Sequence, residues 1–166
     1  MNSTLRTSLA ALGLSAAGLV GIVRLEGYSE RAMVPVKGDR PTIGFGTAGA
    51  DVKLGDKTTP PLALARALND VQRDERALKG CVSVPLAQHE YDAYVSMTYN
   101  VGAAAFCNST LVRRLNAGDY AGACDEILRW RFFQGKDCSL PMYQRLCGGL
   151  WARRQAEHGQ CMGATP

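Results

Sequence analysis

Three residues in the first third of the chain have side chains that could together hydrolyse a glycosidic bond. Glu26 follows a long uncharged run, so folding would place its carboxyl group at the mouth of an apolar core, where it could donate a proton to a leaving oxygen. Asp39 stands in a predicted turn and could orient a water molecule, and Thr42 could hold the same water through its hydroxyl group. Each residue also has an ordinary interpretation, as a surface glutamate, a turn former and a strand residue.

The residues around this trio predict a small β element. Residues 24–50 are rich in glycine and proline, and their apolar residues alternate with polar ones: Val34, Val36, Ile43 and Phe45. This pattern is typical of short strands around a Lys37-Gly38-Asp39 turn. Asp39 would then lie in the turn, and Thr42 on the strand that follows it.

The rest of the chain predicts helices. Thr59 is an N-cap candidate, and Pro60 and Pro61 suit the first helical positions. The inward face of this helix is expected to hold Leu64, Leu68, Val71 and Leu78, and the helix should end near Gly80. Further helices are expected from Gln88 to Gly102, from Asn108 or Ser109 to Gly118, from Asp119 onward, and from Gly149 to Gln160, with an irregular stretch over 133–149. The fold class is therefore α+β and mostly α.

The first 23 residues predict an export segment. Arg6 is the only charged side chain before Arg24, and the 17 residues between them carry no charge. A bilayer span typically needs about 20 residues, and this run is rich in Ala and Gly, so its hydrophobicity is marginal. It also resembles a secretory signal peptide, while a soluble amphipathic helix would need a charged face that the run lacks. Cleavage would remove the helix that supports Glu26, so we expect a segment that stays attached.

The composition limits the partners. The 166 residues suit about one domain, and the net charge of +4, from 19 basic and 15 acidic residues, suits a mildly anionic partner such as a wall polymer or a membrane face. No Lys/Arg run or aromatic-basic platform points to nucleic acid. No CxxC pair or His-rich cluster is present, so neither a metal nor another cofactor is expected.

The six cysteines all lie in the second half of the chain, and their even number favours disulfide bridges in an oxidising compartment. Six cysteines allow 15 pairings, which sequence alone does not distinguish. Their positions favour one set. Cys124 and Cys161 fall on the inner faces of two late helices, Cys138 and Cys147 bracket one loop, and Cys81 and Cys107 remain.

The segment around Glu26 resembles the phage-type lysozymes of glycoside hydrolase family twenty-four, the endolysins of double-stranded DNA phages. Glu26-Gly27 and Thr42-Ile43-Gly44-Phe45-Gly46 match the signature of that family. Later landmarks also match: VPLAQHEYDAYVSMTYNVGAAAF (82–106), STLVRRLNAGDY (109–120), LRW (128–130) and GGLWARRQAE (148–157). The resemblance implies a small β-hairpin lobe, a helical C-terminal lobe, and hydrolysis of the β-1,4 bond between N-acetylmuramic acid and N-acetylglucosamine in peptidoglycan.

One position departs from the family pattern. The usual acidic residue stands six positions before the threonine, where this chain has Val36, and the spacing between Glu26 and Thr42 is one residue longer than usual. Asp39 is the carboxylate left in the hairpin, with Asp51 and Asp56 as later candidates. The resemblance thus implies Glu26 as general acid, with Asp39 and Thr42 positioning the attacking water in an inverting mechanism.

The N-terminus resembles the signal-anchor-release segment of some endolysins of this family. This implies a chain with residues 1–23 as that segment and residues 24–166 as the lysozyme domain. It also implies a monomer tethered first to the host inner membrane, through the host export machinery, and then released into the periplasm without cleavage.

Three other functions remain open. A lytic transglycosylase uses a single glutamate and leaves a 1,6-anhydro product. A cysteine–histidine amidase or peptidase would need a free thiol near His89 or His158. A non-enzymatic membrane-anchored lysis accessory protein would use the segment from Glu26 to Thr42 for structure alone.

Overall fold

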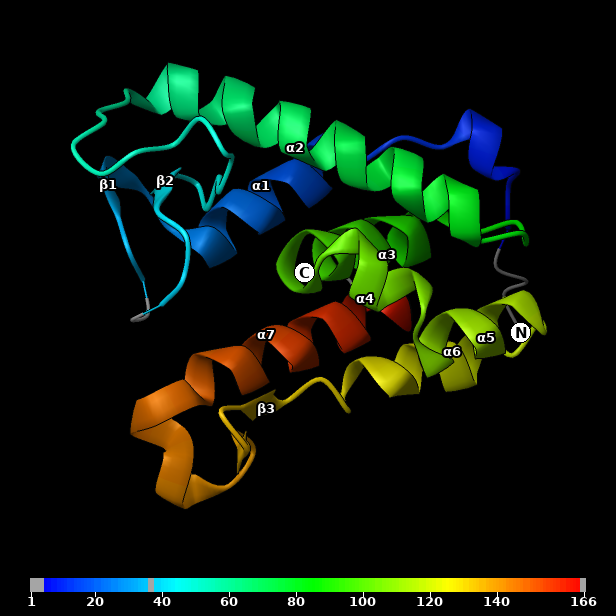
Figure 1. Cartoon of the computed structure of the whole chain (residues 1–166). Coiled ribbons are helices and arrows are strands. Elements are labelled where there is room, and N and C mark those ends of the chain that lie inside the picture. Colours follow the sequence, from blue (N-terminus) through cyan, green and yellow to red (C-terminus); the bar gives the residue numbers. More distant parts are fainter. Residues whose placement is uncertain (1–4, 36–37, 165–166) are drawn as a thin grey trace. The chain divides into compact units, whose positions relative to one another are not determined.

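The computed structural model describes residues 5–35 and 38–164, and the chain divides into two compact units (Figure 1). The smaller unit is Ala16–Arg73. The larger unit takes the residues up to Ser15 together with those from Asp74 onward. Helix α2 (Pro60–Cys81) contributes residues to both units. The elements are mostly helices with short antiparallel strands, which confirms the predicted α+β class.

The smaller unit begins with helix α1 (Ala16–Glu26). The helix ends at Glu26 because Gly27 has φ +69°, a left-handed conformation that glycine adopts without steric cost. Strands β1 (Ser29–Met33) and β2 (Thr42–Gly44) then pair antiparallel, with Ser29 opposite Gly44 and Met33 opposite Thr42. The predicted hairpin is therefore present, but its first strand starts before Val34, which is exposed and follows the strand. Val36 and Lys37 lie outside the described residues.

The chain returns along the other side of β1 before α2 begins. The Ala32 amide donates to the Asp56 carbonyl at 3.0 Å, and the Thr58 amide donates to the Glu30 carbonyl at 2.9 Å. These bonds satisfy backbone groups of β1 that would otherwise form an open sheet edge. The unit buries apolar side chains from α1, β2, the loop that follows β2, and α2: Ile22, Ile43, Val52, Ala63, Ala67 and Val71.

Helix α2 starts at Pro60, as predicted, but its buried face differs from the prediction. Leu64 and Leu68 are 41% and 42% exposed, whereas Ala63 and Ala67 are buried. The reason is close packing against β2, since a Cβ atom on Gly44 would lie 2.7 Å from Cβ of Ala63. Only small residues fit such an approach, so the expectation that Leu64 and Leu68 point inward was wrong, while Val71 and Leu78 are fully buried as expected.

The larger unit is built from helices that mostly begin where the sequence predicts. They are α3 (Gln88–Val101), α4 (Ala103–Cys107), α5 (Thr110–Asn116), α6 (Tyr120–Ile127) and α7 (Gln144–Cys161). Ser109 caps α5 by accepting from the Val112 amide, and Asp119 caps α6 by accepting from the Gly122 amide. Two changes from the prediction are the short α4 and the early start of α7, which is kinked at Cys147. The stretch expected to be irregular contains β3 (Phe132–Phe133), β4 (Lys136–Asp137) and the 3-10 turn η2 (Pro141–Tyr143).

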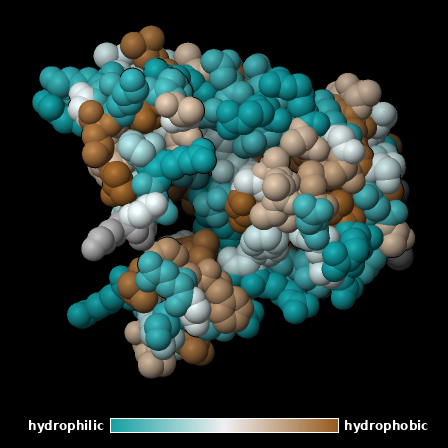
Figure 2. All heavy atoms as spheres, viewed as in Figure 1, coloured by the Kyte–Doolittle hydropathy of each residue, from teal (hydrophilic) through white to brown (hydrophobic). Residues whose placement is uncertain are grey.

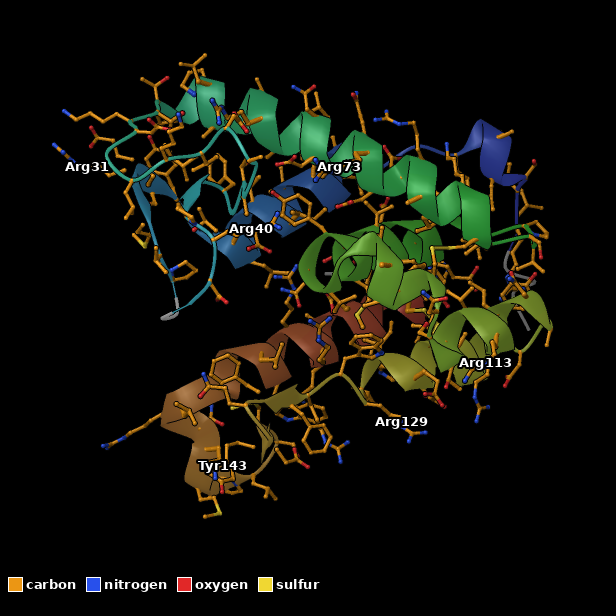
Figure 3. The ribbon with its side chains drawn as sticks, viewed as in Figure 1. Arg31, Arg40, Arg73, Arg113, Arg129 and Tyr143 are labelled. Carbon is orange, nitrogen blue, oxygen red and sulfur yellow. A yellow bond between two sulfur atoms is a disulfide. The ribbon has the colours of Figure 1, made fainter. Side chains whose placement is uncertain are left out.

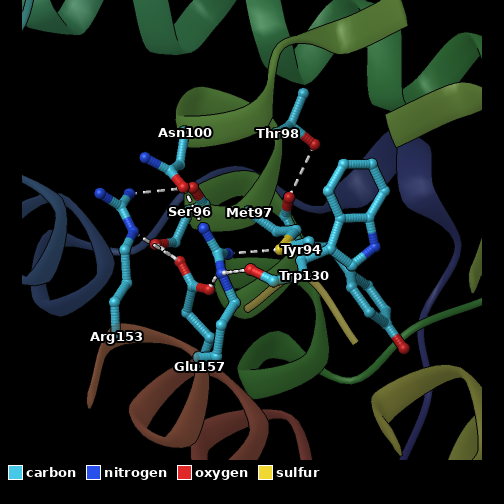
Figure 4. A network of polar contacts seen from close by, with 9 residues as sticks. Tyr94, Ser96, Met97, Thr98, Asn100, Trp130, Arg153 and Glu157 are labelled. Carbon is cyan, nitrogen blue, oxygen red and sulfur yellow. Dashed lines mark hydrogen bonds and ion pairs between the residues drawn. The ribbon is translucent and has the colours of Figure 1, made fainter. Parts of the chain in front are cut away.

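A buried polar network joins α3 to α7 inside the larger unit (Figure 4). Glu157, 2% exposed, accepts hydrogen bonds from Ser96 at 2.8 Å and from Arg153 at 3.0 Å. Arg154, fully buried, donates to Glu157, to Asn100 and to the Trp130 carbonyl. Because each charged group is hydrogen-bonded, the cost of burying the charges is offset by the contacts that they make.

Three disulfides cross-link the larger unit, with the pairing that residue positions favoured. Cys81–Cys107 joins α2 to α4, Cys124–Cys161 joins α6 to α7, and Cys138–Cys147 joins the residue after β4 to the kink in α7. Apolar side chains also reach the surface near this last bridge, at Phe132, Leu140, Met142 and Leu146. In Figure 2 brown and teal atoms alternate over the lower part of the view, so hydrophobic and hydrophilic residues are mixed there.

The uncharged N-terminal run does not form one helix. It contains a 3-10 turn, η1 (Leu9–Ala11), then an extended stretch, then α1. Among the described residues, no helix has both the length and the apolar character that a membrane span requires.

Candidate active site

Glu26 lies at the C-terminus of α1, directly before the glycine that ends the helix. Its side chain is half-buried, and its carboxyl group lies against the backbone of Gly46, where an added Cβ atom would be 2.9 Å from Oε2 of Glu26. Gly46 also has φ +83°. Glycine is therefore required at position 46 for two reasons. The backbone has a left-handed conformation, and Glu26 occupies the space that a side chain would need.

Thr42 is the first residue of β2, and a tight turn follows this strand. Ile43 and Thr47 exchange backbone hydrogen bonds of 3.0 and 3.1 Å, which fold Gly46 back beside the strand that carries Thr42. The Thr42 hydroxyl is 3.5 Å from the Met33 carbonyl, a long contact that leaves it able to bind a further partner. The signature residues Glu26, Thr42 and Gly46 therefore belong to one compact unit.

Asp39 lies in the connection between β1 and β2. It is exposed, and within the described part of the chain it makes no hydrogen bond or ion pair. The two other candidate carboxylates have structural partners: Asp51 pairs with Arg66 at 3.2 Å, and Asp56 accepts from the Lys53 amide at 2.9 Å. Of the three aspartates, Asp39 is thus the one whose carboxylate has no structural partner there.

Two aromatic rings that the sequence analysis did not assign to the site flank these residues in the chain. Tyr28 and Phe45 have ring centroids 5.4 Å apart, and the Tyr28 hydroxyl donates to the Thr58 carbonyl at 3.1 Å. Tyr28 follows Glu26 by two residues, and Phe45 precedes Gly46, so their positions beside the motif were the available signal. The ring pair links the end of α1 to the turn after β2.

Exposed arginines surround the hairpin. Arg31 is on β1 and Arg40 follows Asp39, and Figure 3 shows both side chains extending from this part of the ribbon. Arg24 is also exposed and lies in the last turn of α1. These cations lie in the smaller unit, the one that carries Glu26, and cations suit an anionic polymer.

The larger unit does not offer a thiol nucleophile. None of the six cysteines is free, all being paired in the described part of the chain. His158 is engaged with Asp125 at 2.9 Å. The arrangement required of a cysteine–histidine amidase or peptidase is therefore not present among the described residues.

A glutamate at the end of the first helix, a small hairpin and a helical unit together define a lysozyme-type glycoside hydrolase, and comparison with known proteins agrees. The Phage lysozyme family matches residues 23–157, and the chain belongs to this family. It is similar to an endolysin of Acyrthosiphon pisum secondary endosymbiont phage 1, with 38% identity over 87% of this chain and 94% of that one. It is also similar to the SAR-endolysin of Pseudomonas phage phiKMV, with 36% identity over 89% of this chain and 87% of the relative.

Solved structures give the same result. The endolysin from Escherichia coli O157:H7 phage FAHEc1 superposes with a TM-score of 0.77 and 32% identity, over 97% of this chain and 98% of the other. The protein is thus an enzyme that hydrolyses peptidoglycan, as the sequence analysis predicted.

Proposed function

We propose that the protein is an endolysin that cleaves the β-1,4 bond between N-acetylmuramic acid and N-acetylglucosamine. Glu26 is the general acid that protonates the leaving oxygen. Asp39 and Thr42 position the water that attacks from the opposite face of the sugar, as an inverting mechanism requires. The observation that carries the proposal is the contact of the Glu26 carboxyl group with Gly46, in the same unit as Thr42.

The test is the substitution Glu26→Gln, which keeps the size of the side chain and removes the proton donor. We expect clearing of a murein gel to fall at least about a hundredfold, the range typical for loss of a general acid, with an unchanged circular dichroism spectrum. Glu30→Gln is the matched control, because Glu30 is an exposed carboxylate on the adjacent strand. Full activity of Glu26→Gln would contradict the assignment.

The products identify the reaction. A lysozyme releases fragments that end in a reducing N-acetylmuramic acid, whereas a lytic transglycosylase leaves a 1,6-anhydro end that is lighter by one water. Mass spectrometry of murein fragments from the purified wild-type protein therefore distinguishes the two. Absence of any released fragment would instead favour a membrane-anchored accessory role without catalysis.

The same proposal includes a route to the wall. The relatives named SAR-endolysin support a chain that is first tethered to the inner membrane by its N-terminal segment and then released into the periplasm intact. The expected result is a membrane-bound form that becomes soluble without losing mass. A soluble form shortened by the segment would show cleavage instead.

A further inference from the structure

The segment 131–147 of the larger unit exposes an unusual amount of apolar surface. Six large apolar side chains are exposed in the described part of this unit, and four of them lie in the segment: Phe132, Leu140, Met142 and Leu146. Met142 is the most exposed of the four, at 75%. Single exposed apolar residues are normal on a protein surface, whereas several in one short stretch indicate a contact surface.

Backbone hydrogen bonds and a disulfide hold the segment in one compact form. Strands β3 and β4 pair antiparallel within it. The Leu140 amide donates to the Asp137 carbonyl at 3.1 Å, and the Tyr143 amide donates to the Leu140 carbonyl at 3.0 Å. The Cys138–Cys147 bridge then fixes the residue after β4 to the kink in α7. Because the backbone is already ordered, little conformational entropy is lost when the segment binds a partner.

The charge of the segment is positive. It contains three basic residues and one acidic residue, Asp137. Arg131 pairs with Asp137 at 3.0 Å, so the single carboxylate is neutralised within the segment. Lys136 and Arg145 are exposed, and among the described residues neither forms an ion pair. The segment therefore combines exposed apolar side chains with two unpaired cations.

From this combination we infer that the segment 131–147 is a docking surface for a phospholipid bilayer with anionic headgroups. Leu140, Met142 and Leu146 are aliphatic side chains that can enter the boundary of the acyl chains, while the two cations attract the headgroups. A glycan strand is a poorer match, because its hydroxyl groups need hydrogen-bonding partners that aliphatic side chains do not offer. The N-terminal segment takes no part in this contact, so the inference goes beyond the proposed tether and does not depend on it.

The test compares two pairs of substitutions in the full-length protein. Leu140→Ser combined with Met142→Ser removes apolar surface from the segment and leaves its charge and its disulfide unchanged. The matched control is Leu54→Ser combined with Leu62→Ser, because these two leucines have similar exposure and lie in the smaller unit. All of these proteins keep the N-terminal segment, so its contribution to membrane binding is the same in each.

The first readout is the quenching of tryptophan fluorescence by vesicles of phosphatidylethanolamine and phosphatidylglycerol with brominated acyl chains. Both tryptophans of the chain lie in the larger unit, and the Arg131 guanidinium is 5.9 Å from the centre of the Trp151 ring. Quenching therefore reports the approach of the segment to the acyl chains, even when another part of the chain also binds the vesicle.

We expect the Leu140→Ser, Met142→Ser variant to need at least about tenfold more lipid than wild type for half-maximal quenching, the factor that corresponds to 1.4 kcal/mol. The control variant should resemble wild type. Equal quenching of the wild type and the Leu140→Ser, Met142→Ser variant would overturn the docking surface.

The second readout tests the headgroup charge. Lys136→Gln combined with Arg145→Gln should raise the lipid requirement about fivefold for each cation removed on vesicles that contain phosphatidylglycerol. The same variant should match wild type on vesicles of phosphatidylcholine alone. If wild type is quenched equally well by both kinds of vesicle, anionic headgroups are not required and the assignment is wrong.

Other occupants of the surface would give different results. If the Leu140→Ser, Met142→Ser variant binds isolated murein sacculi less well but is quenched like wild type, the segment contacts the wall and not the bilayer. If its only effect is the loss of a dimer in sedimentation velocity, the occupant is a second copy of the chain. If wild type is quenched as expected but never forms a tethered species in cells, the docking surface stands and the tether proposal fails.

Discussion

Gly46 shows at the scale of one residue why the signature glycines matter. The Glu26 carboxyl group occupies the space that a side chain at this position would need. Its positive φ adds a second constraint. Gly46 therefore leaves room for the Glu26 carboxyl group without carrying any functional group itself.

Replacing Gly46 with alanine should displace Glu26. The left-handed backbone alone costs about 1–2 kcal/mol, and the Cβ atom would in addition push the carboxyl group away. We expect activity to fall at least about tenfold in murein hydrolysis assays, a loss larger than the drop in stability explains.

Gly55→Ala is the matched control for this substitution. Gly55 has φ +97° in the same unit, and a Cβ atom there would meet no other atom within 4 Å. It should lose a similar stability in thermal unfolding and keep its activity. If both variants lose activity equally, the specific contact with Glu26 is not the cause.

Asp39 and Asp51 should behave differently on neutralisation. Asp39→Asn removes a carboxylate that has no structural partner in the described chain, so the turnover number should fall with little change in unfolding temperature. Asp51→Asn breaks a pair with Arg66 on a surface where ion pairs contribute about 0–1 kcal/mol, so activity should persist. The reverse pattern, measured by hydrolysis kinetics, would move the water-positioning role to Asp51.

At the scale of elements, capping residues and a proline made the helix starts predictable. Pro60, Ser109 and Asp119 stand where the sequence indicates, because each satisfies or removes a free backbone amide locally. The buried face of α2 was not predictable in this way. It depends on how closely Gly44 approaches Ala63, a contact between segments that spacing within the helix does not encode.

The candidate site also contains residues that the sequence predicted and contacts that it did not. Glu26 and Thr42 follow from motif residues, and the role of Asp39 follows only from its being the hairpin carboxylate left over. The Tyr28–Phe45 ring pair and the Arg6–Glu90 pair were missed, because both join positions whose partners become neighbours only on folding.

The cap of α6 should make the larger unit sensitive to acid. Hydrogen bonding from Arg114, followed by the Gly122 amide, lowers the pKa of Asp119 below its ordinary value of 3.8. Since the folded-state pKa is the lower one, this contribution is present above pH 3.8 and is lost as the pH falls through the folded-state pKa.

Asp119→Asn tests this, because asparagine still caps a helix but does not titrate. We expect the unfolding temperature of the variant to depend less on pH below 3.8 than that of wild type. Identical acid profiles for the two proteins would show that the cap does not contribute.

At the scale of the whole molecule, the two units differ in their covalent support. All three disulfides lie in the larger unit, while the smaller unit, which carries Glu26, has none. Bridges stabilise chiefly by restricting the unfolded chain, and the effect grows with the length of the loop that they close.

The disulfides should therefore differ in what their removal costs. Cys124 and Cys161 are separated by 37 residues, and Cys138 and Cys147 by 9. Loop entropy predicts that alanine at both members of the first pair costs about 1 kcal/mol more than at both members of the second. Urea unfolding at equilibrium measures this difference, and a larger loss for Cys138 and Cys147 would point to a strained or structured unfolded state.

The confinement of every cysteine to one unit has a practical consequence for producing the protein. The cytosol of an expression host keeps cysteine thiols reduced. In protein purified from the cytoplasm, the larger unit therefore lacks its three disulfides. The smaller unit contains no cysteine, so its covalent structure is the same whether the protein is made in a reducing or an oxidising compartment. Batches that differ only in oxidation history should thus share the same smaller unit and differ in shelf life, and thiol titration before an assay measures the oxidation state of each batch.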